Sequence, residues 1–202
     1  YGIGKAYDHC ITKSKTDIFM IFHADMMLGK NADLEAFKYL EKGKVVCSTR
    51  IEPPLHPEGP EKIIENFGMW PEEDIEDGWK EKEFDIFVED SKIKYKDKTT
   101  NGCFAPWMMY KKDFLKMGGH DPRFHSCRED SDVFNRCVLA EYDLIQSWES
   151  FVYHLTARAG QFQHGKLTKD NSLKSKEWSD MMEASTREFY RKWGSIVLHD
   201  EY

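Results

Sequence analysis

The stretch Asp17-Ile-Phe-Met-Ile-Phe-His-Ala-Asp-Met-Met-Leu28 decides the fold of this chain. Its apolar run from Ile18 to Phe22 lies between polar residues, which is the pattern of a strand buried on both faces of a parallel sheet. His23 and Asp25 follow at the point where this strand should end. Ligands bind at the carboxyl ends of strands in open α/β sheets, so we interpret this pair as a candidate binding site. The alternative is an aspartate that satisfies an ordinary turn.

Residue periodicity predicts alternating helices and strands around this stretch. Residues 2–16 form a predicted helix, because apolar residues recur three and four positions apart. The residues expected to face the sheet are Ile3, Ala6, Tyr7, Cys10 and Ile11. A second predicted helix starts at Asn31 and stops at Gly43, and Lys44–Thr49 form the next strand. This order is typical of a mostly parallel α/β sheet flanked by helices.

The segment over residues 50–98 interrupts this order. Four prolines exclude regular structure from its first part, and the remainder is heavily charged. Aromatic residues lie between the charges, among them Trp70, Trp79, Phe84 and Phe87. Linkers lack groups worth burying, so we interpret the segment as an irregular insertion that packs on the domain and shapes a binding cleft. The alternative is a variable surface excursion without catalytic importance.

From Thr99 onward the alternation returns. The predicted elements are, in chain order, a strand at Trp107–Tyr110, a short helix at Lys112–Met117, a helix that starts with Ser126-Cys127-Arg128-Glu129 and runs to about Glu141, strands at Asp143–Trp148 and Phe151–Tyr153, and a final helix at about Ser175–Trp193. Ser126 and Glu129 fit a capping box at the start of the second of these helices. His154 follows the last predicted strand, and a polar loop over residues 156–171 separates it from the final helix.

Length and composition narrow the functional class. The chain has 202 residues, of which 40% are hydrophobic, which is enough for one domain with a core. The formal net charge of -7 argues against a general nucleic-acid binder, because phosphate neutralisation requires clustered lysine and arginine. The five cysteines are widely spaced without a CxxC pair, so we expect reduced thiols in a cytoplasmic protein rather than disulfides or a thiolate zinc site.

Apolar run lengths and the start of the chain give two further expectations. No apolar run is long enough for a membrane span and no signal peptide pattern is present, so we expect neither in these residues. The first predicted strand begins soon after Tyr1, which is not an initiating methionine. We therefore expect an N-terminally incomplete domain.

Four sequence motifs, taken in order, resemble the family 2 glycosyltransferases of the GT-A fold, which are nucleotide-sugar-dependent enzymes. The first motif is Gly4 to Ile11, which is similar to the family's Gly-x-x-x-Ala-x-Asn with Asp8 in place of Asn, and the second is Phe22-His23-Ala24-Asp25, which stands where the family has Asp-x-Asp. The third is Gly118-Gly119-His120-Asp121 followed by Glu129-Asp130-Ser131-Asp132, which is similar to Gly-Gly-Phe-Asp followed by Glu-Asp-x-Asp. The fourth is Tyr153-His154 together with the later Lys192-Trp193-Gly194. The likeness implies a single GT-A-like domain over residues 1–202, apart from the insertion. Two features depart from the family: His23 replaces the first Asp of the metal motif, and the opening strand and helix that hold the nucleotide base are absent from these residues.

The resemblance implies that a sugar moves, with inversion, from a nucleotide-sugar donor to a hydroxyl of a glycan or another acceptor. A divalent metal, Mn²⁺ or Mg²⁺, is expected to stabilise the diphosphate leaving group. Asp25 is the first expected ligand and His154 the second, because family members often complete the metal shell with a histidine here and imidazole suits Mn²⁺ better than Ca²⁺. The alternative for His154 is a structural histidine at a strand end. His23 is expected near the ribose or the metal.

The same resemblance assigns the catalytic base to Asp130. This residue lies in the first turn of its predicted helix, where the helix dipole favours the carboxylate. Glu129 is expected to cap the helix first and to bind the acceptor second, and Asp132 has the same two interpretations. Trp107 is a candidate platform for a sugar ring, with a core tryptophan as the alternative.

Basic residues are expected to contact the donor. By resemblance, Lys5 and Asp8 touch the nucleotide through the first helix. Arg158, Lys166 and Lys169 lie in the polar loop after His154 and are expected to reach the diphosphate when the loop closes. A solvated loop is the alternative.

Inversion is predicted because one base and one metal suffice for direct displacement and no candidate for a covalent nucleophile is apparent.

Two rival functions remain open at this point. A nucleotidyltransferase on a related sheet needs a lysine-containing glycine-rich loop at its start, and none is visible here. A non-catalytic carbohydrate-binding or assembly module that retains the GT-A fold is favoured by His23 and by the absent opening strand.

Overall fold

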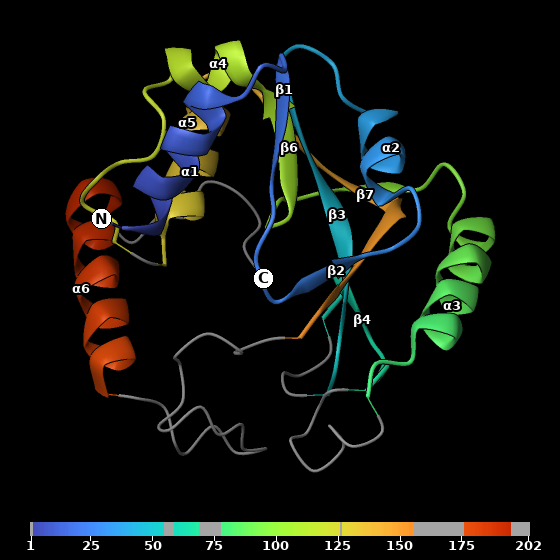
Figure 1. The fold of residues 1–202 in the computed structure, drawn as a ribbon. Helices are drawn as coiled ribbons and strands as arrows, with labels where there is room; N and C mark the ends of the chain where they lie inside the picture. The colour runs from blue at the N-terminus through green and yellow to red at the C-terminus, as the bar shows by residue number, and fades with distance from the viewer. Residues whose placement is uncertain (1, 55–58, 69–77, 126, 156–175, 195–202) are drawn as a thin grey trace.

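The computed structural model describes residues 2–54, 59–68, 78–125, 127–155 and 176–194. In this part of the chain, strands in the order β1-β6-β3-β7-β2 form one sheet, with β4 beside β3 and β5 beside β7 (Figure 1). The strands are β1 (Ile18–Ile21), β2 (Met26–Leu28), β3 (Lys44–Glu52), β4 (Lys62–Ile64), β5 (Thr99–Asn101), β6 (Trp107–Tyr110) and β7 (Asp143–His154). The helices are α1 (Ile3–Lys13), α2 (Ala32–Phe37), α3 (Glu81–Lys94), α4 (Lys111–Lys116), α5 (Glu129–Leu139) and α6 (Lys176–Trp193).

The α/β fold class is confirmed, but the sheet is mixed rather than mostly parallel. β3 runs parallel to β7 and to β4, whereas β1 with β6, β3 with β6, β2 with β7 and β5 with β7 are antiparallel pairs. Alternating helices and strands predict crossover connections, but they do not specify which strands become neighbours. The first strand is also half-buried in alternation rather than buried on both faces, because it lies at one end of the strand order.

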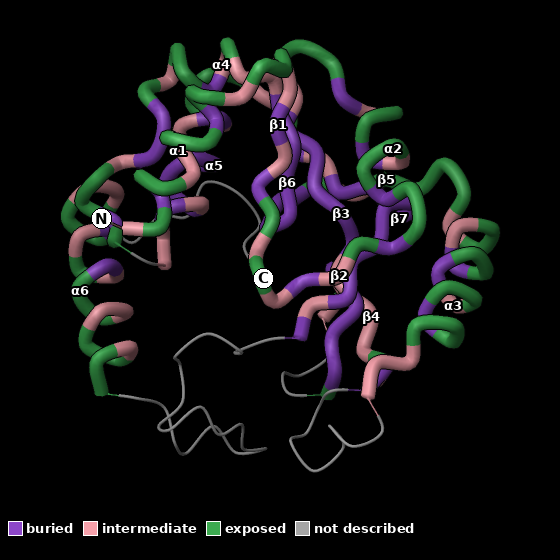
Figure 2. The backbone as a smooth tube through the Cα atoms, viewed as in Figure 1, coloured by how far each residue is buried: buried purple, intermediate pink, exposed green. Residues whose placement is uncertain are grey.

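Side chains of β3 point alternately into two helical layers, as strand geometry requires. Val45 and Cys47 belong to a core that includes residues of α1, α4 and α5. Val46, between them, packs in a separate core with Ala36 of α2 and with Leu40. Figure 1 accordingly shows α1, α4 and α5 on one side of the strands and α2 and α3 on the other, and Figure 2 shows buried residues concentrated along β3 and β7.

The segment predicted as an irregular insertion contains regular structure. β3 continues to Glu52, β4 adds to the sheet beside it, and α3 packs on the other end of the segment. Phe84 of α3 is 2% exposed and forms a core with Phe67 and with Tyr153 of β7. Prolines therefore exclude regular structure only locally, and Trp70 lies outside the described residues.

The predicted capping box at the start of α5 is wrong for Glu129. The helix begins at Glu129 itself, and its N-cap is Arg128, which has a left-handed conformation (φ 66) and makes no side-chain cap hydrogen bond. A capping-box glutamate stands three residues after the cap, so Glu129 is in the wrong position for that bond. Ser126 lies outside the described residues.

Two further findings concern membrane-spanning helices and the cysteines. None of the described helices has the length and apolar character needed to cross a membrane. All five cysteines are free; Cys47, Cys103 and Cys137 are buried, whereas Cys10 is exposed on α1.

We predict that α3 unfolds together with the sheet. Phe84→Ala should lower the free energy of unfolding by about 3–5 kcal/mol, because it empties space between α3 and β7. Ile86→Ala on the same helix is the matched control, because Ile86 is 64% exposed and its truncation should change stability by no more than about 0.5 kcal/mol. Urea unfolding followed by circular dichroism measures both variants. Equal effects of the two substitutions would show that α3 is not part of the cooperative fold.

Candidate metal site and catalytic carboxylate

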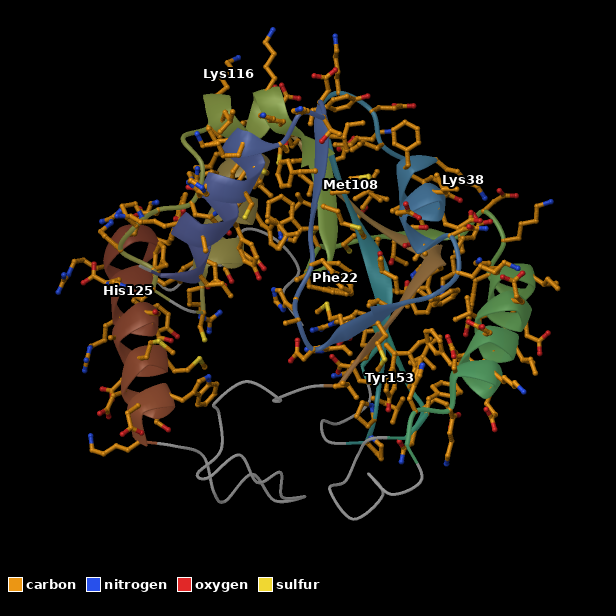
Figure 3. All side chains as sticks on the ribbon, in the orientation of Figure 1. Phe22, Lys38, Met108, Lys116, His125 and Tyr153 are labelled. Carbon is orange, nitrogen blue, oxygen red and sulfur yellow. The ribbon has the colours of Figure 1, made fainter. Side chains whose placement is uncertain are left out.

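Antiparallel pairing of β2 with β7 creates the candidate site. In this register Met26 is opposite His154, and the backbone N–H of Leu155 donates to the carbonyl of Asp25 over 2.9 Å. The turn that carries His23 and Asp25 therefore lies against the end of β7. In Figure 3 the labels Phe22 and Tyr153 mark the residues that immediately precede His23 and His154.

Three predicted residues converge there. One ligand atom each of His23, Asp25 and His154 can be chosen so that all lie within 4.8 Å of one another. Nε2 of His154 is 3.6 Å from Oδ2 of Asp25. Nε2 of His23 is buried and has no hydrogen-bond partner among the described residues. A buried nitrogen without a partner is costly unless something binds it, so the cluster fits a cation held by two imidazoles and one carboxylate.

A buried glutamate, which the sequence did not indicate, orients His154. Oε1 of Glu52 lies 2.8 Å from Nδ1 of His154, and the Glu52 side chain is only 2% exposed. An acceptor at Nδ1 favours the tautomer with the proton on Nδ1 and holds the ring so that Nε2 faces Asp25. Outer carboxylates act in the same way on histidine ligands of metals. Only the parallel register of β3 and β7, which pairs Ile51 with Tyr153, brings these residues together.

Cations on two strands stabilise the buried charge of Glu52. Nζ of Lys62 on β4 lies 3.1 Å from one carboxylate oxygen, and Arg50 lies 3.4 Å from the other. Burial raises the pKa of Glu52, but the hydrogen bond to His154 and these two cations lower it well below its ordinary range. Burial lowers the pKa of His154, but its hydrogen bonds to Asp25 and Glu52 raise the pKa by a larger amount, so the net pKa lies above the ordinary value. A metal at Nε2 competes with a proton for this nitrogen.

Asp130 shares a cavity with this cluster. The cavity has a volume of about 180 Å³, and its walls include His23, His154, Arg50 and Asp130. Nε of Arg50 is buried and has no hydrogen-bond partner among the described residues. The structure thus brings a predicted base, two predicted metal ligands and one unpredicted cation to a single hollow.

Trp107 holds Asp130 rather than a sugar. Its side chain is fully buried at 0% exposure, so the prediction of a sugar platform is wrong. Instead, Nε1 of Trp107 donates to Oδ1 of Asp130 over 3.0 Å. Asp130 lies in the first turn of α5, as predicted, and the described part of the chain offers no hydrogen bond to its Oδ2.

Glu129 lies beside Asp130 in a more enclosed position. It is 6% exposed, and its Oε2 has no partner among the residues described. Burial, followed by the charge of Asp130, raises the pKa of Glu129 to about 7. A carboxyl group in this environment carries a proton through much of the neutral range.

Asp132 is a structural residue that joins two helices. Its side chain is fully buried and accepts from Nε of Arg136 at 3.0 Å and from Nε1 of Trp193 at 2.9 Å, and Lys192 forms an ion pair with it. These bonds attach α6 to α5, which explains why the Lys192-Trp193 motif accompanies the Glu-Asp-x-Asp motif. All of the carboxylate's contacts are therefore internal.

The predicted nucleotide contacts of α1 are not at the cavity. Both carboxylate oxygens of Asp8 face the backbone N–H of His120, at 3.2 and 3.1 Å, and one of them also lies 2.7 Å from its ring nitrogen Nδ1. Lys5 is exposed and lines a separate hollow with His125. The predicted diphosphate contacts Arg158, Lys166 and Lys169 lie outside the described residues.

Comparison with known proteins supports the fold. No protein-family model matches the chain, and no curated protein matches it in sequence. The fold is similar to the solved structure of GalNAc-T7 with UDP, GalNAc and Mn²⁺, with a TM-score of 0.50 and 11% identity. The match covers 95% of this chain and 44% of that one, so this chain spans less than half of the length of GalNAc-T7. At this identity the likeness shows that the chain has an α/β fold similar to that of a GT-A glycosyltransferase.

Proposed function

We propose that this chain carries the catalytic centre of an inverting, metal-dependent glycosyltransferase. The observation that carries the proposal is the shared cavity, in which His23 and His154 of the candidate metal cluster face the same space as Asp130. The transfer requires charge stabilisation at a diphosphate and proton removal from a hydroxyl, and the cavity offers groups for both. The fold similarity to GalNAc-T7 supports the same reaction class.

The proposed cation ligands are Asp25, His154 and His23. Two imidazoles and one carboxylate suit Mn²⁺, and Mg²⁺ is the weaker candidate because it prefers oxygen ligands. When bound, the cation neutralises the charge that develops on the diphosphate leaving group. Glu52 holds the ring of His154 in place, and Arg50 adds positive charge to the cavity wall for the same diphosphate.

Asp130 is the proposed base. Trp107 binds Oδ1, which leaves Oδ2 to receive the proton of the acceptor hydroxyl. The helix dipole of α5 favours the anionic form, so the proton is accepted late, when the hydroxyl has become more acidic. Glu129 is the proposed acceptor-binding residue, and its carboxyl group can donate a hydrogen bond where it carries a proton.

The donor is a nucleotide sugar and the acceptor a glycan or another hydroxyl compound. Arg158 remains a proposed donor contact. The proposed nucleotide contacts do not include Lys5 and Asp8, because Lys5 lines a separate hollow and Asp8 contacts His120. The rival function, a non-catalytic carbohydrate-binding module, predicts that sugar binds without nucleotide or metal.

We predict that the three ligands and Glu52 determine Mn²⁺ affinity. Asp25→Ala, His154→Ala and His23→Ala should each weaken Mn²⁺ binding about tenfold or more, and Glu52→Gln about 10–100-fold, because it releases the ring of His154. His9→Ala is the matched control, because His9 is exposed on α1. Calorimetric titration with MnCl₂ measures the affinities, with circular dichroism as the check of folding. Unchanged affinity in Asp25→Ala or His154→Ala would place the metal elsewhere.

Asp130→Asn should lower kcat by about 10²–10⁴-fold, because the amide cannot accept the proton. The assay is nucleotide release by the full-length protein from a panel of UDP-sugars and GDP-sugars with Mn²⁺. Asp33→Asn, at an exposed position of α2, is the control and should leave kcat unchanged. Nearly intact turnover in Asp130→Asn, with native circular dichroism and Mn²⁺ affinity, would refute the base assignment.

Nucleotide binding separates the transferase from the carbohydrate-binding module. Calorimetry with UDP and with GDP, each with and without Mn²⁺, should show binding of one nucleotide that requires the metal and is lost in Asp25→Ala. Binding of free sugars without any nucleotide binding by the full-length protein would support the module instead.

A further inference from the structure

We infer that Asp8, His120 and Asp130 form an aspartate–histidine–aspartate chain in which His120 acts as a positioning residue for the base. The inference rests on the proposed function of Asp130, which it deepens. Asp8 and His120 are the positions at which this sequence has Asp and His where the family patterns it resembles have Asn and Phe. Two departures that are far apart in the sequence therefore lie in direct contact.

The geometry of the chain favours a doubly protonated ring. Nδ1 of His120 lies 2.7 Å from Oδ1 of Asp8, and Nε2 lies 3.8 Å from Oδ1 of Asp130. A carboxylate can only accept, so Nδ1 must carry a proton. In the neutral ring with that proton, the lone pair of Nε2 would face the anionic Asp130. The imidazolium form donates to Asp8 and places a positive charge beside Asp130, although Nε2 makes no hydrogen bond among the described residues.

The fold brings α1 and the Gly118–His120 turn unusually close together. A Cβ at Gly4 would lie 2.7 Å from Cβ of His120, and a Cβ at Gly119 would lie 2.8 Å from Oδ2 of Asp8. Gly119 also has a φ of +69, which disfavours any other residue. Gly4 and Asp8 are four residues apart and thus share one face of α1. Both glycines are therefore required for Asp8 to reach the ring of His120.

Apolar and aromatic groups exclude water from the ring. The His120 side chain is 1% exposed, and the rings of Tyr7, Trp107 and Phe114 have centroids 5.1 to 6.3 Å from it. Water is the usual competitor of ion pairs, so the interaction between His120 and Asp130 is screened little here.

Two carboxylates beside the ring favour its cation, Asp8 on α1 and Asp130 at the start of α5. Tyr7, Trp107 and Phe114 are uncharged neighbours from α1, β6 and α4, and Glu129 next to Asp130 has a raised pKa. Burial lowers the pKa of His120, but its interactions with Asp130 and Asp8 outweigh burial and raise the pKa to about 9. Because this pKa lies above the ordinary value, the stabilisation is complete below about pH 6.5 and is lost as the pH rises through about 9.

The chain has a defined consequence for catalysis. The imidazolium and Trp107 both lie beside Oδ1 of Asp130, which restricts the rotamer of this side chain at the cavity wall. Deprotonation of His120 removes one of these two interactions and should therefore lower the rate at alkaline pH.

The first test is independent of turnover. Nitrogen-15 NMR of the imidazole side chains in the full-length protein follows the protonation of His120 directly. We expect a doubly protonated ring at pH 7.5, a midpoint near 9, and a midpoint about one unit lower in Asp8→Asn. Asp8→Asn is isosteric and at a partly exposed position, so it retains the fold. A neutral His120 at pH 7.5 overturns the inference.

The second test uses the pH profile of kcat/KM for nucleotide release. His120→Phe and His120→Gln should lower kcat about 10–100-fold with a small change in the donor KM, and should remove the alkaline decline that deprotonation of His120 causes. His9→Phe is the control. A profile in both variants like that of the parent protein overturns the positioning role. If the parent protein shows no turnover but His120 titrates near pH 9, the transferase proposal fails while the charged chain stands.

Discussion

The candidate site depends on the pairing of two short stretches of backbone, β2 and the end of β7. This antiparallel contact holds the turn after β1 against the last residue of a strand that comes more than a hundred positions later in the sequence. A slip of one residue would turn His154 to the opposite face of the sheet, because side chains alternate along a strand. Register is fixed by the cores on both sides of β7, so the arrangement of the ligands is a consequence of hydrophobic packing.

Charge is buried at three places around this contact, and each is compensated internally. Glu52 is surrounded by Lys62, Arg50 and His154; Asp132 by Arg136, Lys192 and Trp193; and His120 by two aspartates. Removing one member of such a group leaves an uncompensated charge, which costs more than the intact group contributes. These networks therefore specify geometry more than they add stability.

The sequence allowed prediction of much of the architecture and of the central site residues. Ile18–Ile21, Trp107–Tyr110 and the helices at α5 and α6 were recognisable from periodicity. His23 and Asp25 were proposed from their place at a strand end and His154 from the family resemblance, and the structure brings the three together. Strand neighbours were not predictable, because periodicity reports which faces are buried and not what covers them. For the same reason Ile3 and Cys10 were assigned to the core, whereas the structure exposes them.

Residues that act through a second residue escaped prediction. The role of Glu52 could not be predicted because it follows from the register of β3 and β7. Asp8 was expected to contact the nucleotide, whereas its partner in the structure is His120. Trp107 was open to both interpretations, since a tryptophan in a strand has the same pattern whether it lies in a core or lines a site. Long-range contacts of this kind require coordinates.

The strand β4 has an evolutionary implication. Its Lys62 is one of the cations beside Glu52, although it belongs to the segment that looked like an optional addition to the domain. A homologue that retains β3 as far as Glu52 but lacks β4 would have a buried anion with one counter-charge fewer. Loss or gain of β4 should therefore be accompanied by replacement of Glu52 or by a new basic residue near it, so that position 52 and β4 are inherited together.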